Sequence, residues 1–165
     1  MLSSGRAGLD LASGIGLGAN YGYQLVGGDK ASLYLEGQFL ASPLRDVGAA
    51  NRQVTLDFAT LYVTPGLRVK VAPRSAVSPF FAVGGGYALY EQSTERLDGQ
   101  PNPAPRHVHR GALQFGGGVD LRTFNWLAFR AEIRDFYTGS PALNIRAPGG
   151  QHNVVVSGGL VLRWE

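Results

Sequence analysis

Three histidines are the residues of this sequence best suited to acid–base chemistry. His152 can be combined with Ser140 and Glu91 into a Ser–His–acid set of the kind that activates a serine nucleophile. Their spacing does not fix such a geometry, and the sequence around each histidine lacks a nucleophile motif. We therefore interpret the histidines as solvent-exposed loop residues, and we predict a protein that is not an enzyme and binds no cofactor.

The other two histidines, His107 and His109, are the candidates for a metal site. A metal ion needs further ligands, and only Glu91, Glu95 and Asp98 lie nearby in the sequence. We therefore predict that these residues hold no metal.

Two glycine triplets, at 84–86 and 116–118, have the composition of a phosphate-binding loop. Neither is followed by a strand-to-helix transition or by a Lys-Ser/Thr pair, both of which belong to such loops. We interpret them as strand glycines that make room for large neighbouring side chains.

The composition favours one all-β domain that spans residues 1–165. Glycine supplies 24 of the 165 residues, which argues against a helical bundle because an interior helical glycine costs about 1 kcal/mol. Zero cysteines exclude a disulfide scaffold, and no apolar run is long enough for a transmembrane helix. The net charge is +3 and the arginines are scattered, so we predict no binding to nucleic acid.

Hydrophobicity alternates with a period of two along most of the chain, which predicts strands. Most of them are long enough to cross a bilayer at a tilt. Connections that alternate between short and long are typical of an up-and-down antiparallel transmembrane β-barrel. The predicted strands are 13–26, 30–41, 54–72, 78–91, 110–122, 126–138 and 152–164, with short connections at 27–29, 73–77 and 123–125 and long ones at 42–53, 92–109 and 139–151.

Hairpin pairing separates an apolar face from a polar one. We pair 13–26 with 30–41 so that 26 faces 30, and 110–122 with 126–138 so that 122 faces 126. One face then contains apolar pairs, such as Tyr23 with Leu33 and Val119 with Phe129. The other face sets small or amide residues against large ones: Gly22 with Tyr34, Asn20 with Glu36, Gly18 with Gln38, Gly118 with Arg130, Gly116 with Glu132 and Gln114 with Arg134.

This pattern predicts that the polar face fills a narrow lumen as an ion-pair network and that the apolar face meets lipid. A solvated face would not need glycine beside each long charged residue, which argues against the alternative, a soluble lipocalin-like ligand-binding barrel. We expect a structural plug rather than a gate or proton path, and no wide pore. The predicted lumen residues are Glu36, Gln38, Gln114, Asp120, Arg122, Arg130, Glu132 and Arg134.

Aromatic residues gather at both ends of the predicted strands, as two interfacial belts would require. The alternative is that aromatic residues simply favour strands. Tyr21, Tyr23, Phe81, Trp126 and Trp164 lie near the short connections, and Phe39, Tyr87, Phe136 and Tyr137 lie toward the long ones.

The segment 54–72 is irregular. Its apolar residues change parity between Phe58 and Leu61, which predicts a bulge near 59–60 or an upper part that stands clear of the membrane. Pro65 removes a backbone donor in the middle of the segment, and we expect a second bulge there with Gly66.

Seven strands do not close an up-and-down barrel, because single-chain bacterial barrels have even strand numbers. We expect a first strand that is missing or very short, in a chain that is a fragment or starts at an internal methionine, with 1–12 as a remnant of an outer loop. The missing piece would hold a signal peptide and the first strand. The alternative is that residues 2–11 form a short, irregular first strand.

The chain resembles the eight-stranded outer-membrane β-barrel family of OmpA, OmpX and opacity-type porin-like proteins. The resemblance covers about 13–164 and implies a bacterial outer-membrane location. Such proteins end on an alternating apolar strand with a terminal aromatic residue that the barrel-assembly machinery reads, whereas Glu165 follows Trp164 here. The residues that carry the resemblance are 84–87, 115–120, 126–135 and 156–164.

The expected role is structural or one of surface interaction, with the lipid bilayer as the main partner. Arg45, Arg52, Arg106 and Arg110 fall in or beside the long connections and are predicted to contact lipopolysaccharide phosphates. The alternative from another functional class is an outer-leaflet lipid A-modifying enzyme, because some barrels of this size resemble such enzymes.

Overall fold

The protein is described here by a computed structural model, which covers the backbone of residues 2–4, 9–11, 15–49, 57–96, 98–139 and 150–164. Side chains are described for 15–42, 59–96, 98–139 and 150–164. These residues form strands and turns without a helix, and none of them belongs to a helix that is long and apolar enough to cross a membrane.

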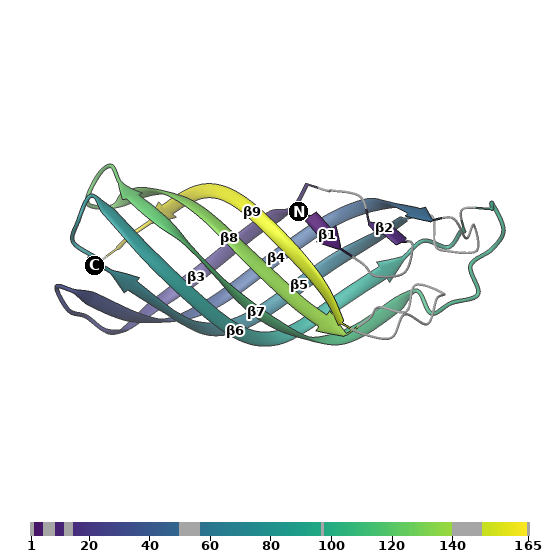
Figure 1. Cartoon of the computed structure of the whole chain (residues 1–165), viewed down its shortest axis with the longest axis horizontal. Helices are drawn as coiled ribbons and strands as arrows, with labels where there is room; N and C mark the ends of the chain where they lie inside the picture. The colour runs from purple at the N-terminus through teal and green to yellow at the C-terminus, as the bar shows by residue number, and fades with distance from the viewer. Residues whose placement is uncertain are drawn as a thin grey trace.

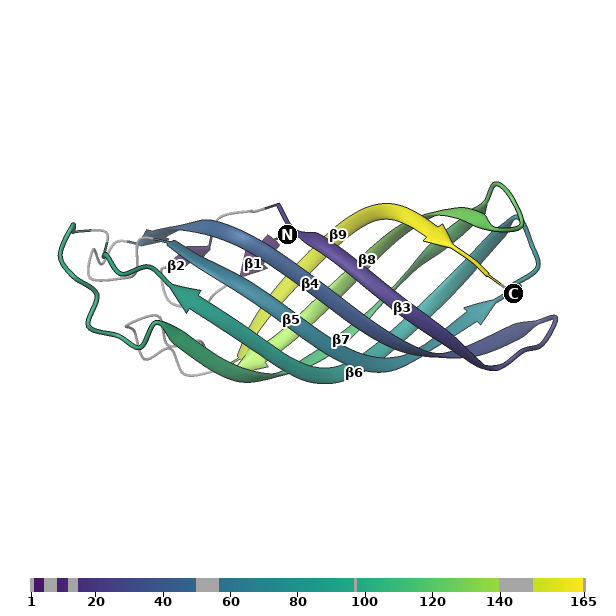
Figure 2. The same ribbon diagram turned by 180° about the vertical axis from the view of Figure 1, so that it is seen from behind.

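Seven long strands run up and down in one antiparallel sheet, and two short strands precede them. Figure 1 and Figure 2 show the long strands tilted and wrapped into one curled sheet. All-β structure and up-and-down order are thereby confirmed. The strands are β1 (Leu2–Ser4), β2 (Leu9–Leu11), β3 (Leu17–Val26), β4 (Ala31–Ala49), β5 (Asp57–Val71), β6 (Val77–Gln92), β7 (His107–Arg122), β8 (Leu127–Gly139) and β9 (Gly150–Leu162).

Two strands are longer than the sequence predicted, because strand structure continues into segments expected to be long connections. β4 extends to Ala49 and β7 begins at His107, so parts of 42–53 and 92–109 are paired strand. Glu95 and Pro101 form an isolated bridge inside the remaining connection between β6 and β7. The connection between β8 and β9, residues 140–149, lies outside the described residues.

The predicted hairpin registers are wrong by two residues, although the faces are right. Tyr23 pairs with Leu35 rather than Leu33, and Val119 pairs with Ala131 rather than Phe129. Turn residues absorb more of the chain than expected, since four residues separate β7 from β8. A shift of two residues preserves the face of every side chain, because side chains alternate with a period of two.

The irregularity predicted in 54–72 lies in the neighbouring strand instead. The register shifts between Ser42 and Arg45 of β4, while β5 itself runs without a break. At Pro65 neither neighbouring strand shows a register shift, so the predicted bulge with Gly66 is absent. Residues 64 and 65 have no paired partners in β6, which is the expected result of a residue without a backbone N–H.

The sheet has a face that carries the buried side chains, which we call the inner face, and an opposite outer face. Among the described side chains, seventeen polar or charged residues are buried, against ten hydrophobic ones. Large hydrophobic residues are exposed along every long strand, as with Phe129 and Ile133 of β8 at 52% and 53% exposure. This distribution is the reverse of the one found in soluble proteins, where apolar side chains fill the interior.

The two short strands lie at one end of the sheet, near the long connections (Figure 1). β1 pairs with β9, and β2 pairs with the far end of β4. Residues 2–4 and 9–11 are thus two separate short strands rather than the single irregular first strand considered from sequence, and neither pairs with β3 among the described residues. Between β3 and β9 the described residues leave a gap, which we call the seam.

Candidate functional site

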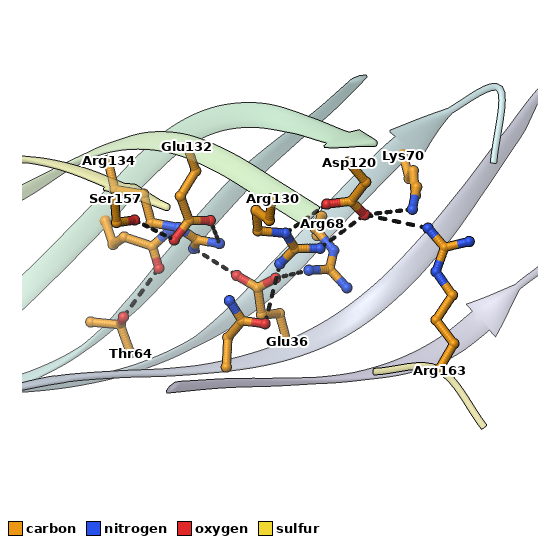
Figure 3. A network of polar contacts seen from close by, with 12 residues as sticks. Glu36, Thr64, Arg68, Lys70, Asp120, Arg130, Glu132, Arg134, Ser157 and Arg163 are labelled. Atoms are coloured by element: carbon orange, nitrogen blue, oxygen red, sulfur yellow. Dashed lines mark hydrogen bonds and ion pairs between the residues drawn. The ribbon is translucent and has the colours of Figure 1, made fainter. Parts of the chain in front are cut away.

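A chain of buried charges occupies the inner face, and Asp120 of β7 is at its centre near the short turns. Its carboxylate is 1% exposed and accepts hydrogen bonds from Arg130 of β8 at 2.7 and 3.1 Å. Lys70 of β5 donates to the same carboxylate at 2.5 Å, and Arg163 lies 3.8 Å from it. Figure 3 shows these cations converging on Asp120 from two strands and the C-terminal end. One carboxylate therefore holds together elements that are not neighbours in the sheet.

A second group of charges centres on Glu36 of β4. Arg68 of β5 and Arg134 of β8 lie 2.7 and 2.6 Å from its two oxygens. Arg134 also donates to Glu132 at 3.0 Å, and Glu132 accepts a further hydrogen bond from Ser157 of β9. All the charged members of this group are buried or nearly so. The group links β4 and β5 to the opposite side of the curled sheet.

The network carries more cations than carboxylates. Glu36, Asp120 and Glu132 supply three negative charges. The five cations bonded or paired to them are Arg68, Lys70, Arg130, Arg134 and Arg163, which leaves an excess of two positive charges. The Nε atoms of Arg68 and Arg134 are buried without a hydrogen-bond partner in the structure. Buried positive charge of this kind favours an additional anionic or polar group nearby.

Glycines make the room that the buried charges need. A Cβ on Gly116 would lie 2.9 Å from Cγ of Arg134, and one on Gly118 would lie 2.8 Å from Cβ of Glu132. A Cβ on Gly22 would lie 2.6 Å from Nη2 of Arg68. The sequence rule that sets small residues against large charged ones is therefore confirmed, with pairings shifted by the register.

Most of the eight predicted lumen residues lie on the inner face, and five of them are ion-paired: Glu36, Asp120, Arg130, Glu132 and Arg134. Gln114 is buried and accepts a hydrogen bond from Thr64 at 3.1 Å. Gln38 is buried but donates only to a neighbouring backbone carbonyl among the bonds described. Arg122 is half-buried at the end of β7 and has none of the described ion pairs. The prediction thus extends the network one residue too far along β7.

Sequence reasoning missed Arg68 and Lys70, both buried on β5. The signal was present, because these residues alternate with Leu67 and Val69, which are exposed on the outer face. The expected irregularity of the segment concealed this alternation. Arg163 was also missed, although the predicted strand 152–164 includes it and the alternation with Leu162 and Trp164 assigns it to the inner face; in the structure it lies just after β9.

Toward the long connections, aromatic and hydroxyl groups replace the charges. The Tyr62 and Tyr90 hydroxyls are 3.2 Å apart, and the Tyr90 hydroxyl is 2.7 Å from that of Thr138. The Tyr62 and Phe136 ring centroids are 4.7 Å apart. Phe136 is 1% exposed, so its expected place in an outer aromatic belt is wrong. This cluster fills the inner face beside the charged network.

The aromatic residues predicted near the short turns are all on the outer surface. Tyr21, Tyr23, Phe81, Trp126 and Trp164 are 57–72% exposed. Tyr21 stacks on Trp164 with ring centroids 6.4 Å apart, so β3 and the end of β9 meet at this point. Toward the other end, Phe39, Tyr87 and Tyr137 are also exposed, at 38–43%.

The structure describes only part of the catalytic set considered from sequence. Nδ1 of His152 lies 2.6 Å from Asp135, and Ser140 lies outside the described residues. His109 is a residue of strand β7, and its side chain contacts the Tyr87 hydroxyl. No group of three metal-ligating side chains occurs among the described residues.

The structure places two of the four arginines that are predicted to contact lipopolysaccharide. Arg106 is paired with Glu91 at 2.6 Å, and Arg110 lies within β7 rather than in a loop. The side chains of Arg45 and Arg52 lie outside the described ones.

A cavity of about 700 Å³ opens along the seam. Its walls are 15–20 on the β3 side and 155–161 on the β9 side, with Arg130, Glu132 and Arg134 behind them. The inner-face charges are therefore reached from the side of the sheet, between the two edge strands.

Comparison with known proteins found no matching family model, no matching curated protein and no matching solved structure.

Proposed function

We propose that this protein is an integral bacterial outer-membrane β-barrel with a structural or surface-interaction role. The observation that carries the proposal is the inverted distribution of side chains. Apolar residues cover the outer face, while ion-paired residues such as Asp120 and Arg130 are buried inside. Lipid is the environment that such an outer face fits, and a small barrel's interior tolerates charges when they are paired.

Two further features support a membrane location. The long strands have 10 to 19 residues, enough to span the hydrocarbon layer at a tilt. Exposed aromatic residues near both strand ends fit the two interfaces. Ion-paired side chains and the aromatic cluster occupy the inner face, which supports a structural plug rather than a wide pore.

The test is a charge scan of the outer face. Ile133→Arg places a charge in the middle of β8, where insertion into lipid vesicles should be lost, since a midplane arginine costs about 2–4 kcal/mol in a barrel. Phe124→Arg, in an exposed turn, is the matched control and should insert nearly as the wild type does. Insertion is measured by flotation with vesicles and by protection from protease.

A soluble ligand-binding barrel gives a different result in the same experiment. Ile133→Arg would then leave a folded protein in plain buffer, because a charge on a solvated face is harmless. Strand signal in circular dichroism without detergent, unchanged by Ile133→Arg, would overturn the membrane proposal.

His152 is paired with Asp135, so the alternative of a lipid A-modifying enzyme is tested with an activity assay. Replacing His107, His109 and His152 by Gln and following lipid A acylation should show no difference from the wild type under the proposal.

Contact with lipopolysaccharide is tested separately by replacing Arg45 and Arg52 by Gln, with Arg74→Gln at the opposite end as the control. Unchanged lipopolysaccharide binding would remove that partner from the proposal.

A further inference from the structure

The seam is bordered by two strands that run in the same direction. Seven antiparallel strands necessarily place the first and the last, β3 and β9, parallel to each other. Among the described residues, β3 pairs only with β4, and residues 155–162 of β9 pair only with β8. Each therefore presents a row of unpaired backbone groups to the seam, which is a template for another strand.

A strand can satisfy both edges only if it runs antiparallel to each of them. β1 already binds β9 in this way, with Leu2 opposite Val154 and Ser4 opposite His152. The free part of β9 begins at the next residue, Val155, so the register of β1 leads directly into the seam. Tyr21 and Trp164 stack across the far end of the seam and close it there.

The residues that border the seam indicate which side chains a strand bound there would carry. On the outer face the borders are apolar, with Leu17 and Tyr23 on one side and Val156 and Leu160 on the other. On the inner face the borders are mostly small or polar, including Gly18, Asn20, Ser157 and Gly159, and the cavity behind them is lined by Arg130 and Arg134. The network there has its excess of positive charge and the unpartnered Nε of Arg134.

We propose that the seam is a binding site for one extended peptide strand with alternating apolar residues outward and small residues inward, including an inward carboxylate that faces Arg130 and Arg134. Backbone hydrogen bonds to both edges supply the affinity, as in β-strand addition, and the alternation supplies the specificity. The inference depends on the sheet edges alone, so its test is independent of the proposed membrane location.

The test is position-specific disulfide trapping, which the absence of native cysteine makes clean. Gly159→Cys adds a thiol on the inner face at the seam, where a Cβ meets nothing within 4 Å. Gly111→Cys on β7 is the control: the position is also open, but it lies on the outer face and away from both edges. The probe is a synthetic peptide of about ten residues, the length of a spanning strand. It alternates Val or Leu with Ser or Gly and carries one central inward Glu and one Cys, at an inward or an outward position.

The full chain is refolded in detergent micelles and oxidised with each peptide. We expect Gly159→Cys to trap the inward-Cys peptide at least about tenfold faster than the outward-Cys peptide, because disulfides need neighbouring Cβ atoms on one face. Gly111→Cys should stay at background, and replacing the peptide Glu by Lys should lower the yield severalfold. If Gly159→Cys does not fold, Ser157→Cys serves at the same inner edge.

Three results would overturn the proposal. Equal trapping at 159 and 111 would mean random collision. Equal trapping of inward and outward cysteines would mean that no strand forms. A disulfide-linked protein dimer as the main product, undiminished by peptide, would show that a second copy of the chain covers the seam.

Discussion

Replacing Asp120 by Asn removes one charge and leaves its cations buried. Asp120 is 1% exposed, and its carboxylate receives Arg130 through two hydrogen bonds and Lys70 through one. The substitution keeps the size of the side chain, so packing changes little. Loss of one partner from a buried ion pair costs about 3–5 kcal/mol, because the remaining charge stays desolvated. We expect the free energy of unfolding to fall by that amount.

The assay is urea unfolding in detergent micelles, followed by the fluorescence of the two tryptophans. Asp29→Asn is the matched control, since Asp29 is 76% exposed and pairs with the equally exposed Arg74. Exposed pairs contribute about 0–1 kcal/mol, so the control should unfold close to the wild type.

A second variant separates the effect of charge on stability from the effect of packing. Asp120→Leu combined with Lys70→Met and Arg130→Met removes the three buried charges of this group, leaves only the more exposed Arg163, and keeps apolar volume. Apolar replacement of a complete buried ion group is often neutral or stabilising, so this triple variant should be more stable than Asp120→Asn. If Asp120→Asn and Asp29→Asn unfold alike, or if the triple variant is the least stable, the electrostatic account of the interior is refuted.

Three further predictions use the same unfolding assay. Gly84→Ala should lose about 1–3 kcal/mol, because its Cβ would lie 2.7 Å from the carbonyl oxygen of Pro65, whereas Gly111→Ala, with open space around it, should change little; equal effects would contradict the close approach of β5 and β6. Tyr90→Phe removes two buried hydroxyl contacts and should cost about 1–3 kcal/mol, and an unchanged midpoint would show that the inner aromatic cluster is not hydrogen-bonded as described. His152→Gln breaks a half-exposed pair with its carboxylate and should cost less than about 1 kcal/mol; a larger loss would point to a structural role for that pair.

The faces of the strands were predictable because the period of two is a local property of the backbone. Residues such as Phe129 and Arg130 are assigned to opposite faces by parity alone, and the structure confirms this. The register was not predictable to better than two residues, since it depends on how many residues the turn between β7 and β8 uses. Parity survives such an error, which explains why the wrong pairs still gave the right interior.

The segment around Pro65 shows a second limit on what a sequence predicts, the position of a bulge. Its apolar residues change parity, and a bulge within the segment is the simplest local explanation. The structure places the shift on β4, between Ser42 and Arg45. A bulge changes the relation between two strands, and a single strand's sequence does not show which partner carries it.

Local sequence determined the strands, their inner and outer faces, and the glycines that make room for charges. The partners of each charge were decided only by the tertiary structure. Lys70 and Asp120 lie on β5 and β7, which are separated by β6, and they meet because the sheet curls and brings the inner-face side chains of these strands together. Arg130 reaches Asn20 across the interior for the same reason. Such contacts depend on the curvature and tilt of the whole sheet, which arise from all its strands together and from no single stretch of sequence.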